Sequence, residues 1–105
     1  MNEVKAVLAV KFQSSHDQET LMEVCQNGLG VFRSVPGLVQ KYYIVEEDTG
    51  ALSGIYLFES TAARETFWNS DLAKTIPSEY GVIPESIRVE KYEMAIVLNE
   101  EAVLV

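Results

Sequence analysis

A chain of 105 residues is long enough for one domain with one hydrophobic core and too short for two, so we expect residues 1–105 to form a single domain. The net charge of −8, with only eight scattered Lys and Arg residues, disfavours nucleic acid and an anionic membrane surface as partners. One Cys and one His can form neither an intrachain disulfide nor an ordinary structural zinc site, so no metal is expected. No apolar run is long enough for a signal peptide or a membrane span, which favours a cytoplasmic protein.

The N-terminal third predicts a strand followed by a helix. Residues 4–12 are apolar and β-branched, which is typical of a strand. The polar cluster from Ser14 to Asp17 supplies residues that cap helices, and Pro36-Gly37 would end the helix that follows. Between these signals, small and apolar residues recur at spacings of three and four, as on one face of a helix. They are Leu21, Cys25, Gly28, Phe32 and Val35.

The middle of the chain predicts a hairpin and a second helix. Residues 38–47 and 51–59 have strand composition, and Asp48-Thr49-Gly50 between them is suited to a turn. Ser60 or Thr61 would then cap a helix that carries Ala63, Phe67, Trp68 and Leu72.

A loop and a long strand complete the pattern. Pro77, Gly81 and Pro84 predict the loop, and residues 86–98 predict the strand. The order β-α-β-β-α-β is that of the ferredoxin-like α+β fold, a four-stranded antiparallel sheet with two helices on one face.

Both faces of this sheet are expected to be apolar. Val7 and Ala9 lie on the second face of the first strand, and residues 54–58 and 94–98 are apolar without alternation. Because soluble monomers rarely expose such a patch, we predict a homodimer in which two sheets pack face to face. Two alternatives stay open: a monomer shielded by its C-terminal tail, and addition of the long last strand with its tail, residues 102–105, to a neighbouring subunit's sheet edge.

Three short segments carry a family resemblance. They are Pro36-Gly37-Leu38, residues 54–60 (GIYLFES) and residues 67–72 (FWNSDL). The chain resembles the dimeric α/β-barrel superfamily, and more narrowly the YdhR-type mono-oxygenases, which are related to antibiotic-biosynthesis mono-oxygenases. The resemblance implies a dimer with a pocket between sheet and helices in each subunit. It also implies oxidation of a small aromatic or quinol-like molecule by O2 without a cofactor, or alternatively a non-catalytic protein that binds a small ligand or a partner.

Haem is not expected as a cofactor. Relatives that degrade haem carry a histidine ligand shortly after the segment resembling Asn69-Ser70-Asp71, and the matching position here is about Pro77. Their tryptophan at the end of the third strand corresponds to Phe58.

Cofactor-free oxygenation requires an apolar cavity with a few hydrogen-bonding groups that stabilise a substrate anion. The catalytic candidates are Tyr56, Trp68, Asn69 and Arg88. Trp68 could form an aromatic wall, Asn69 and Arg88 could donate hydrogen bonds, and a tyrosine could move a proton. Each also has a structural role open to it, as core, helix cap or solvated charge.

The ligand-binding candidates are Tyr43, Phe58 and Gly28. Gly28 falls on the buried face of the first predicted helix, where glycine costs about 1 kcal/mol relative to alanine. A glycine at this position indicates either close packing of helix against sheet or a hole that a ligand could fill.

Overall fold

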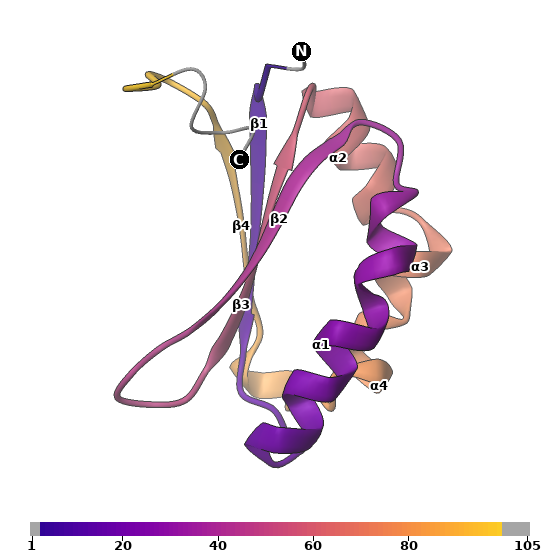
Figure 1. The fold of residues 1–105 in the computed structure, drawn as a ribbon, viewed down its shortest axis with the longest axis vertical. Helices are drawn as coiled ribbons and strands as arrows, with labels where there is room; N and C mark the ends of the chain where they lie inside the picture. Colours follow the sequence, from indigo (N-terminus) through magenta and orange to yellow (C-terminus); the bar gives the residue numbers. More distant parts are fainter. Residues whose placement is uncertain (1–2, 100–105) are drawn as a thin grey trace.

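The computed structural model describes residues 3–99, which form a sheet covered by helices on one side (Figure 1). The elements follow one another as β1 (Ala6–Phe12), α1 (Gln18–Arg33), β2 (Leu38–Val45), β3 (Leu52–Phe58), α2 (Thr61–Trp68), α3 (Asp71–Lys74), α4 (Ile76–Glu79), a 3-10 turn (Pro84–Ser86) and β4 (Arg88–Glu93). The strands pair in the order β2-β3-β1-β4, and each pair is antiparallel. The predicted ferredoxin-like α+β fold is therefore confirmed.

Local signals set the helix and turn boundaries as the sequence predicted. The side chain of Asp17 accepts a hydrogen bond from the Thr20 amide and caps α1, and the Ser60 hydroxyl caps α2 in the same way. Gly37 and Gly50 both have positive φ, so each turn uses the conformation that glycine adopts without strain.

The structure corrects the prediction for the second helix and the loop after it. The helical region is interrupted at Asn69 and restarts as α3, because the Ser70 side chain accepts from the Ala73 amide and starts a new N-terminus. Pro77 was predicted to lie in a loop, but it lies in the first turn of α4. A proline is tolerated there because its missing N–H has no partner in a first helical turn.

The last strand is shorter than predicted. Residues 86–98 were expected to be extended and paired, but β4 ends at Glu93. Among the described strands it pairs with β1 alone, which begins at Ala6 opposite Glu93, and the Met94 amide still donates to the Lys5 carbonyl at 2.9 Å. Beyond Met94, the described chain forms no further strand. Residues 102–105, for which strand addition was one alternative, lie outside the described residues.

The core lies between the sheet and the helices. Alternate residues of β1 and β3 are buried, and the largest fully buried side chains are Phe58, Leu8, Leu52 and Val10. The other sheet face carries no helix (Figure 1). Its outward residues include the exposed Tyr42, Ile44 and Tyr92. Within residues 3–99, no helix is both long and apolar enough to cross a membrane.

Candidate functional site

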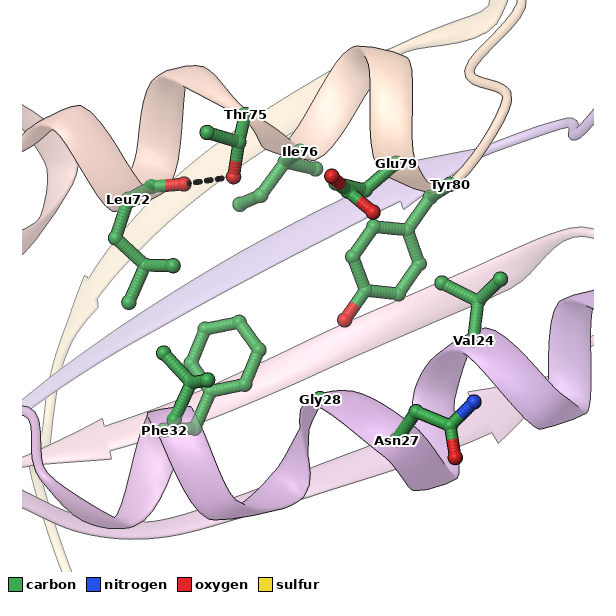
Figure 2. A pocket seen from close by; sticks show the side chains of 10 residues that line it. Val24, Asn27, Gly28, Phe32, Leu72, Thr75, Ile76, Glu79 and Tyr80 are labelled. Atoms are coloured by element: carbon green, nitrogen blue, oxygen red, sulfur yellow. Dashed lines mark hydrogen bonds between the residues drawn. The ribbon is translucent and has the colours of Figure 1, made fainter.

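A cavity of about 350 Å³ lies between α1 and the segment formed by α3 and α4. We call it the α1–α4 cavity, and Figure 2 shows the side chains that surround it. Its walls are mostly apolar and come from the two facing helical segments. The lining residues are Val24, Asn27, Gly28, Val31, Phe32, Leu72, Thr75, Ile76, Glu79 and Tyr80.

Helical spacing positions the α1 wall. Val24, Gly28 and Phe32 follow one another at intervals of four residues, so they lie on one face of α1. Gly28 leaves room in the middle of this face, where the Tyr80 hydroxyl points toward it (Figure 2). A Cβ on Gly28 would lie 3.3 Å from the Tyr80 hydroxyl oxygen and 3.7 Å from the Phe32 ring. A side chain at this position would therefore compete with a ligand for space.

Tyr80 supplies the polar atom on the inner wall of the cavity. The residue follows α4, and only 6% of its surface is exposed. The Thr75 hydroxyl is occupied by a hydrogen bond of 2.7 Å to the Leu72 carbonyl. Asn27 and Glu79 are exposed and lie on the two facing walls (Figure 2). The arrangement is an apolar slot with one inner hydroxyl and polar groups at its margin, which suits a small ring that carries a hydroxyl group.

Behind Tyr80, a chain of hydrogen bonds runs along the inner side of the sheet. The hydroxyl oxygens of Tyr80 and Tyr43 are 2.5 Å apart, and the Lys41 ammonium donates to the Tyr43 oxygen at 2.6 Å. Lys41 Nζ also lies over four aromatic rings. It is 3.2 Å from the centroid of Phe32, 4.2 Å from that of Tyr43, 4.4 Å from that of Tyr56 and 5.9 Å from that of Tyr80. Aromatic faces attract a cation, so they hold the Lys41 side chain in place.

Burial changes the proton affinity of each side chain in this series of hydrogen bonds. Burial lowers the pKa of Lys41 to about 7, and the nearby Cys25 opposes this change. Burial raises the pKa of Tyr43, as does its hydrogen bond with Tyr80, and burial also raises the pKa values of Tyr56 and Tyr80. Near neutral pH, the tyrosines therefore keep their protons, whereas the lysine is the group that can gain or lose one.

Three of the predicted site residues lie in or next to the cavity. Gly28 lines it, and Tyr43 and Tyr56 line a much smaller space of about 10 Å³ that also touches Tyr80. Phe58 is fully buried and packs against Phe67, with ring centroids 5.7 Å apart. Phe58 is thus part of the core beneath the site and has no surface facing the α1–α4 cavity.

The other predicted residues lie elsewhere. Trp68 is half-buried at the end of α2 and packs against the core. The Asn69 side chain donates to the Glu65 carbonyl at 2.9 Å and caps α2. Arg88 is exposed on β4 and pairs with Glu90 at 3.4 Å. None of these three side chains lines the α1–α4 cavity.

Tyr80 and Lys41 were not among the predicted site residues. Tyr80 was overlooked because Pro77 suggested a loop, although proline in a first helical turn would have allowed a helix that ends beside Tyr80. Lys41 alternates with Tyr43 on the predicted strand, which is the signal that both face the same side of the sheet. Within residues 3–99, no group of three or more His, Cys, Asp and Glu side chains could hold a metal ion.

Comparison with known proteins assigns the chain to a family. Residues 7–100 match the model of the family described as "Putative mono-oxygenase ydhR". The chain belongs to the ydhR family. The predicted resemblance to the YdhR-type mono-oxygenases is thereby confirmed. Among curated protein sequences, none matches the chain.

Solved structures share the fold of this ydhR family member. NE2512, a protein of unknown function from Nitrosomonas europaea, is 17% identical with a TM-score of 0.72, and the match covers 94% of this chain and 98% of that one. A monooxygenase from the gene ActVA-Orf6 of Streptomyces coelicolor, in complex with nanaomycin D, is 19% identical with a TM-score of 0.68, covering 91% and 92%. SnoaB, a cofactor-independent oxygenase from Streptomyces nogalater, is 11% identical with a TM-score of 0.65, covering 91% and 96%.

Proposed function

We propose that this ydhR family member is a mono-oxygenase that oxidises a small aromatic or quinol-like molecule with O2 in the α1–α4 cavity, without a bound cofactor. The observation that carries the proposal is the cavity itself, an apolar slot with the Tyr80 hydroxyl on its inner wall. The family match supports mono-oxygenation. The fold shared with SnoaB, described as a cofactor-independent oxygenase, supports the absence of a cofactor.

The size of the cavity favours a small substrate. At about 350 Å³ it falls near the lower end of the range of ligand pockets, about 300–1,000 Å³. The Phe32 and Tyr80 rings can contact the faces or edges of an aromatic ligand, and Leu72 and Ile76 add apolar surface. A molecule of one or two fused rings fits this space better than a larger polycyclic one.

The number of electrons that O2 accepts limits which substrates the protein can oxidise. A mono-oxygenase without a cofactor needs a substrate that supplies all four electrons that O2 accepts. A hydroquinone does so: conversion to a hydroxyquinone oxidises the quinol to a quinone and replaces one ring C–H by C–OH. One oxygen atom enters the product and the other leaves as water with the two hydroxyl protons. Loss of a proton from the quinol makes its first electron transfer to O2 easier, so a site that favours the anion accelerates the reaction.

The predicted residues contribute unequally to this proposal. Gly28 provides space for the ligand, and Tyr43 and Tyr56 support Tyr80 from behind. Trp68 and Asn69 hold α2 in place, which is a structural contribution.

Oxygen uptake tests the proposal. Purified protein is given hydroquinone, methylhydroquinone and dihydroxynaphthalene in turn, and the rate is compared with uncatalysed autoxidation. We expect saturable uptake with at least one quinol and its loss in Gly28→Leu, which fills the cavity. Uptake at the autoxidation rate with every quinol would contradict the oxygenase. Saturable binding of the same quinols without uptake would favour the alternative of a non-catalytic ligand-binding protein.

We also propose that the protein is a cytoplasmic homodimer whose two sheets pack through their helix-free faces. Val7, Ile55 and Leu57 face outward in the middle of the sheet, and exposed Tyr42 and Tyr92 lie on either side of them. Such a continuous apolar surface supports association with a second copy. Sedimentation analysis would detect the dimer, and Ile55→Asp should convert it to a monomer. A wild-type monomer at micromolar concentration would contradict this proposal.

A further inference from the structure

Three side chains on the inner side of the sheet connect two hollows of the molecule. Tyr80 lines the α1–α4 cavity. Lys41 lines a second, smaller hollow of about 130 Å³, which we call the α1–β2 hollow. Tyr43 lies between them, 2.5 Å from the Tyr80 oxygen and 2.6 Å from Lys41 Nζ. The three polar atoms therefore form one unbroken path from the α1–α4 cavity to the α1–β2 hollow.

We propose that Tyr80, Tyr43 and Lys41 form a proton relay through which the neutral Lys41 amine takes the hydroxyl proton of a phenolic ligand bound in the α1–α4 cavity. The proposal rests on the proposed function for the class of ligand. It adds the base that the oxidation requires, at a residue that does not itself touch the substrate.

The transfer conserves protons and electrons at each step. The ligand O–H bond breaks as its proton moves to the Tyr80 oxygen, and the former Tyr80 proton moves to the Tyr43 oxygen. The former Tyr43 proton forms a new N–H bond on Lys41, whose lone pair accepts it. The result is a ligand phenolate and a Lys41 ammonium. Either tyrosine oxygen can be the donor in the Tyr43–Tyr80 hydrogen bond. As an ammonium, Lys41 donates to the Tyr43 oxygen, but as a neutral amine its lone pair can accept from the Tyr43 hydroxyl across the same 2.6 Å contact.

The surroundings of Lys41 make it the proton acceptor of the relay. Its pKa is lowered to about 7 by burial, whereas burial keeps both tyrosines protonated, so these carry a proton without storing a charge. The other ionisable groups around the path are Cys25 on α1 and Tyr56 on β3, both buried, and Arg33 and Glu79 at the margins of the two hollows. Burial raises the pKa values of Cys25 and Tyr56, so both are protonated near neutral pH.

Two mechanisms could produce a bound phenolate, and they differ in where its proton goes. In the relay, the proton stays on Lys41, so the solution gains none. If Lys41 were already an ammonium and only attracted the anion, binding a neutral phenol as phenolate would release a proton to the buffer. Proton release therefore separates a relay from simple charge attraction.

The experiment uses meta-nitrophenol, whose phenolate absorbs at longer wavelength than its phenol and whose own pKa lies above the assay pH. At about pH 7.5, just above the pKa of about 7, most Lys41 is neutral. We expect the bound probe to show the phenolate spectrum, because attraction between the buried phenolate and the Lys41 ammonium offsets the lower pKa of Lys41. A pH indicator in weak buffer should record no matching proton release. A bound probe that stays neutral, a stoichiometric proton release, or no binding at millimolar concentration would each overturn the relay.

Single-residue variants test which side chains carry the proton from the ligand to Lys41. Lys41→Met and Tyr43→Phe should still bind the probe, because neither side chain lines the α1–α4 cavity, but the phenolate spectrum should disappear. Lys74→Met removes an exposed lysine from α3 and should leave it unchanged. Phenolate formation that persists in Lys41→Met would contradict the proposal. As a readout independent of optical spectra, the Lys41 pKa measured by NMR should rise when the probe binds, and an unchanged value would count against the relay. Since neither measurement involves O2, a relay without oxygen uptake would refute only the oxygenase.

Discussion

Lys41→Met should change how the stability of the protein depends on pH. In the folded state, burial lowers the pKa of Lys41 from 10.5 to about 7, with Cys25 opposing the change. The unfolded chain therefore binds a proton at Lys41 between about pH 7 and pH 10.5 that the folded chain does not bind. The free energy of unfolding consequently rises with pH across this window. Below about pH 7 both states are protonated, and the full cost of the buried charge is present.

The size of the effect follows from the lowered pKa. Since each tenfold change in proton affinity corresponds to about 1.4 kcal/mol, lowering the pKa from 10.5 to about 7 corresponds to about 5 kcal/mol. About 3 kcal/mol of this falls between about pH 6 and pH 9.5, where Lys41 of the unfolded chain is still largely protonated. Over that range the wild type should therefore gain about 3 kcal/mol relative to Lys41→Met.

Urea unfolding at several pH values measures this difference. The upper limit stays below about pH 10, where tyrosines of the unfolded chain begin to ionise while the buried ones do not. Groups distant from Lys41 titrate alike in both proteins, so the difference between the two curves reports Lys41 together with its coupling to Cys25. Lys74→Met controls for the loss of one positive charge at the surface. A difference between wild type and Lys41→Met that stays constant from about pH 6 to pH 9.5 would refute the reasoning.

The remaining predictions concern ligand space and packing. Gly28→Leu should weaken meta-nitrophenol binding at least about tenfold in an optical titration, because its side chain enters the cavity. Gly30 is exposed on the same helix, and a Cβ there has no neighbour within 4 Å, so Gly30→Leu should bind normally. Gly37→Ala should lower the free energy of unfolding by about 2 kcal/mol or more, because φ at this position is +78° and the new Cβ would lie 2.5 Å from a methyl carbon of α2. A thermal unfolding midpoint equal to that of the wild type would contradict this prediction. Arg64→Met should lower the free energy of unfolding by about 1–3 kcal/mol, because Arg64 is buried and donates to a β4 carbonyl at 2.9 Å. Arg88→Met removes an exposed ion pair and should lower it by less than about 0.5 kcal/mol. Equal urea midpoints for the two arginine variants would show that Arg64 is not a packing residue.

The fold was predictable because its signals are local. The alternation of apolar residues identified β1 and β3, and the caps at Asp17 and Ser60 marked helix starts. The error in the last strand arose because its length depends on a partner far away in sequence. The apolar run continues to residue 98, but β1 begins at Ala6, and within residues 3–99 the pairing goes no further than the hydrogen bond from the Met94 amide to the Lys5 carbonyl.

The site was only partly predictable because it depends on contacts between distant segments. Gly28 was recognisable as an unusual residue on a buried helix face. Nothing local indicated that Tyr80 would lie opposite it, because that contact needs α3 and α4 to fold as short helices around Pro77. The lowered pKa of Lys41 likewise arises from burial beneath side chains of α1, β2 and β3 that only the tertiary structure brings together.

Oxygen isotope incorporation tests the central claim most directly. The protein is incubated with a hydroquinone under O2 labelled with the heavy isotope, and the product is analysed by mass spectrometry beside Gly28→Leu and Gly30→Leu. The account predicts one labelled oxygen atom per product molecule for the wild type and Gly30→Leu, and only the uncatalysed background for Gly28→Leu. Equal labelling in all three proteins, or none above background in the wild type, would contradict oxidation in the α1–α4 cavity.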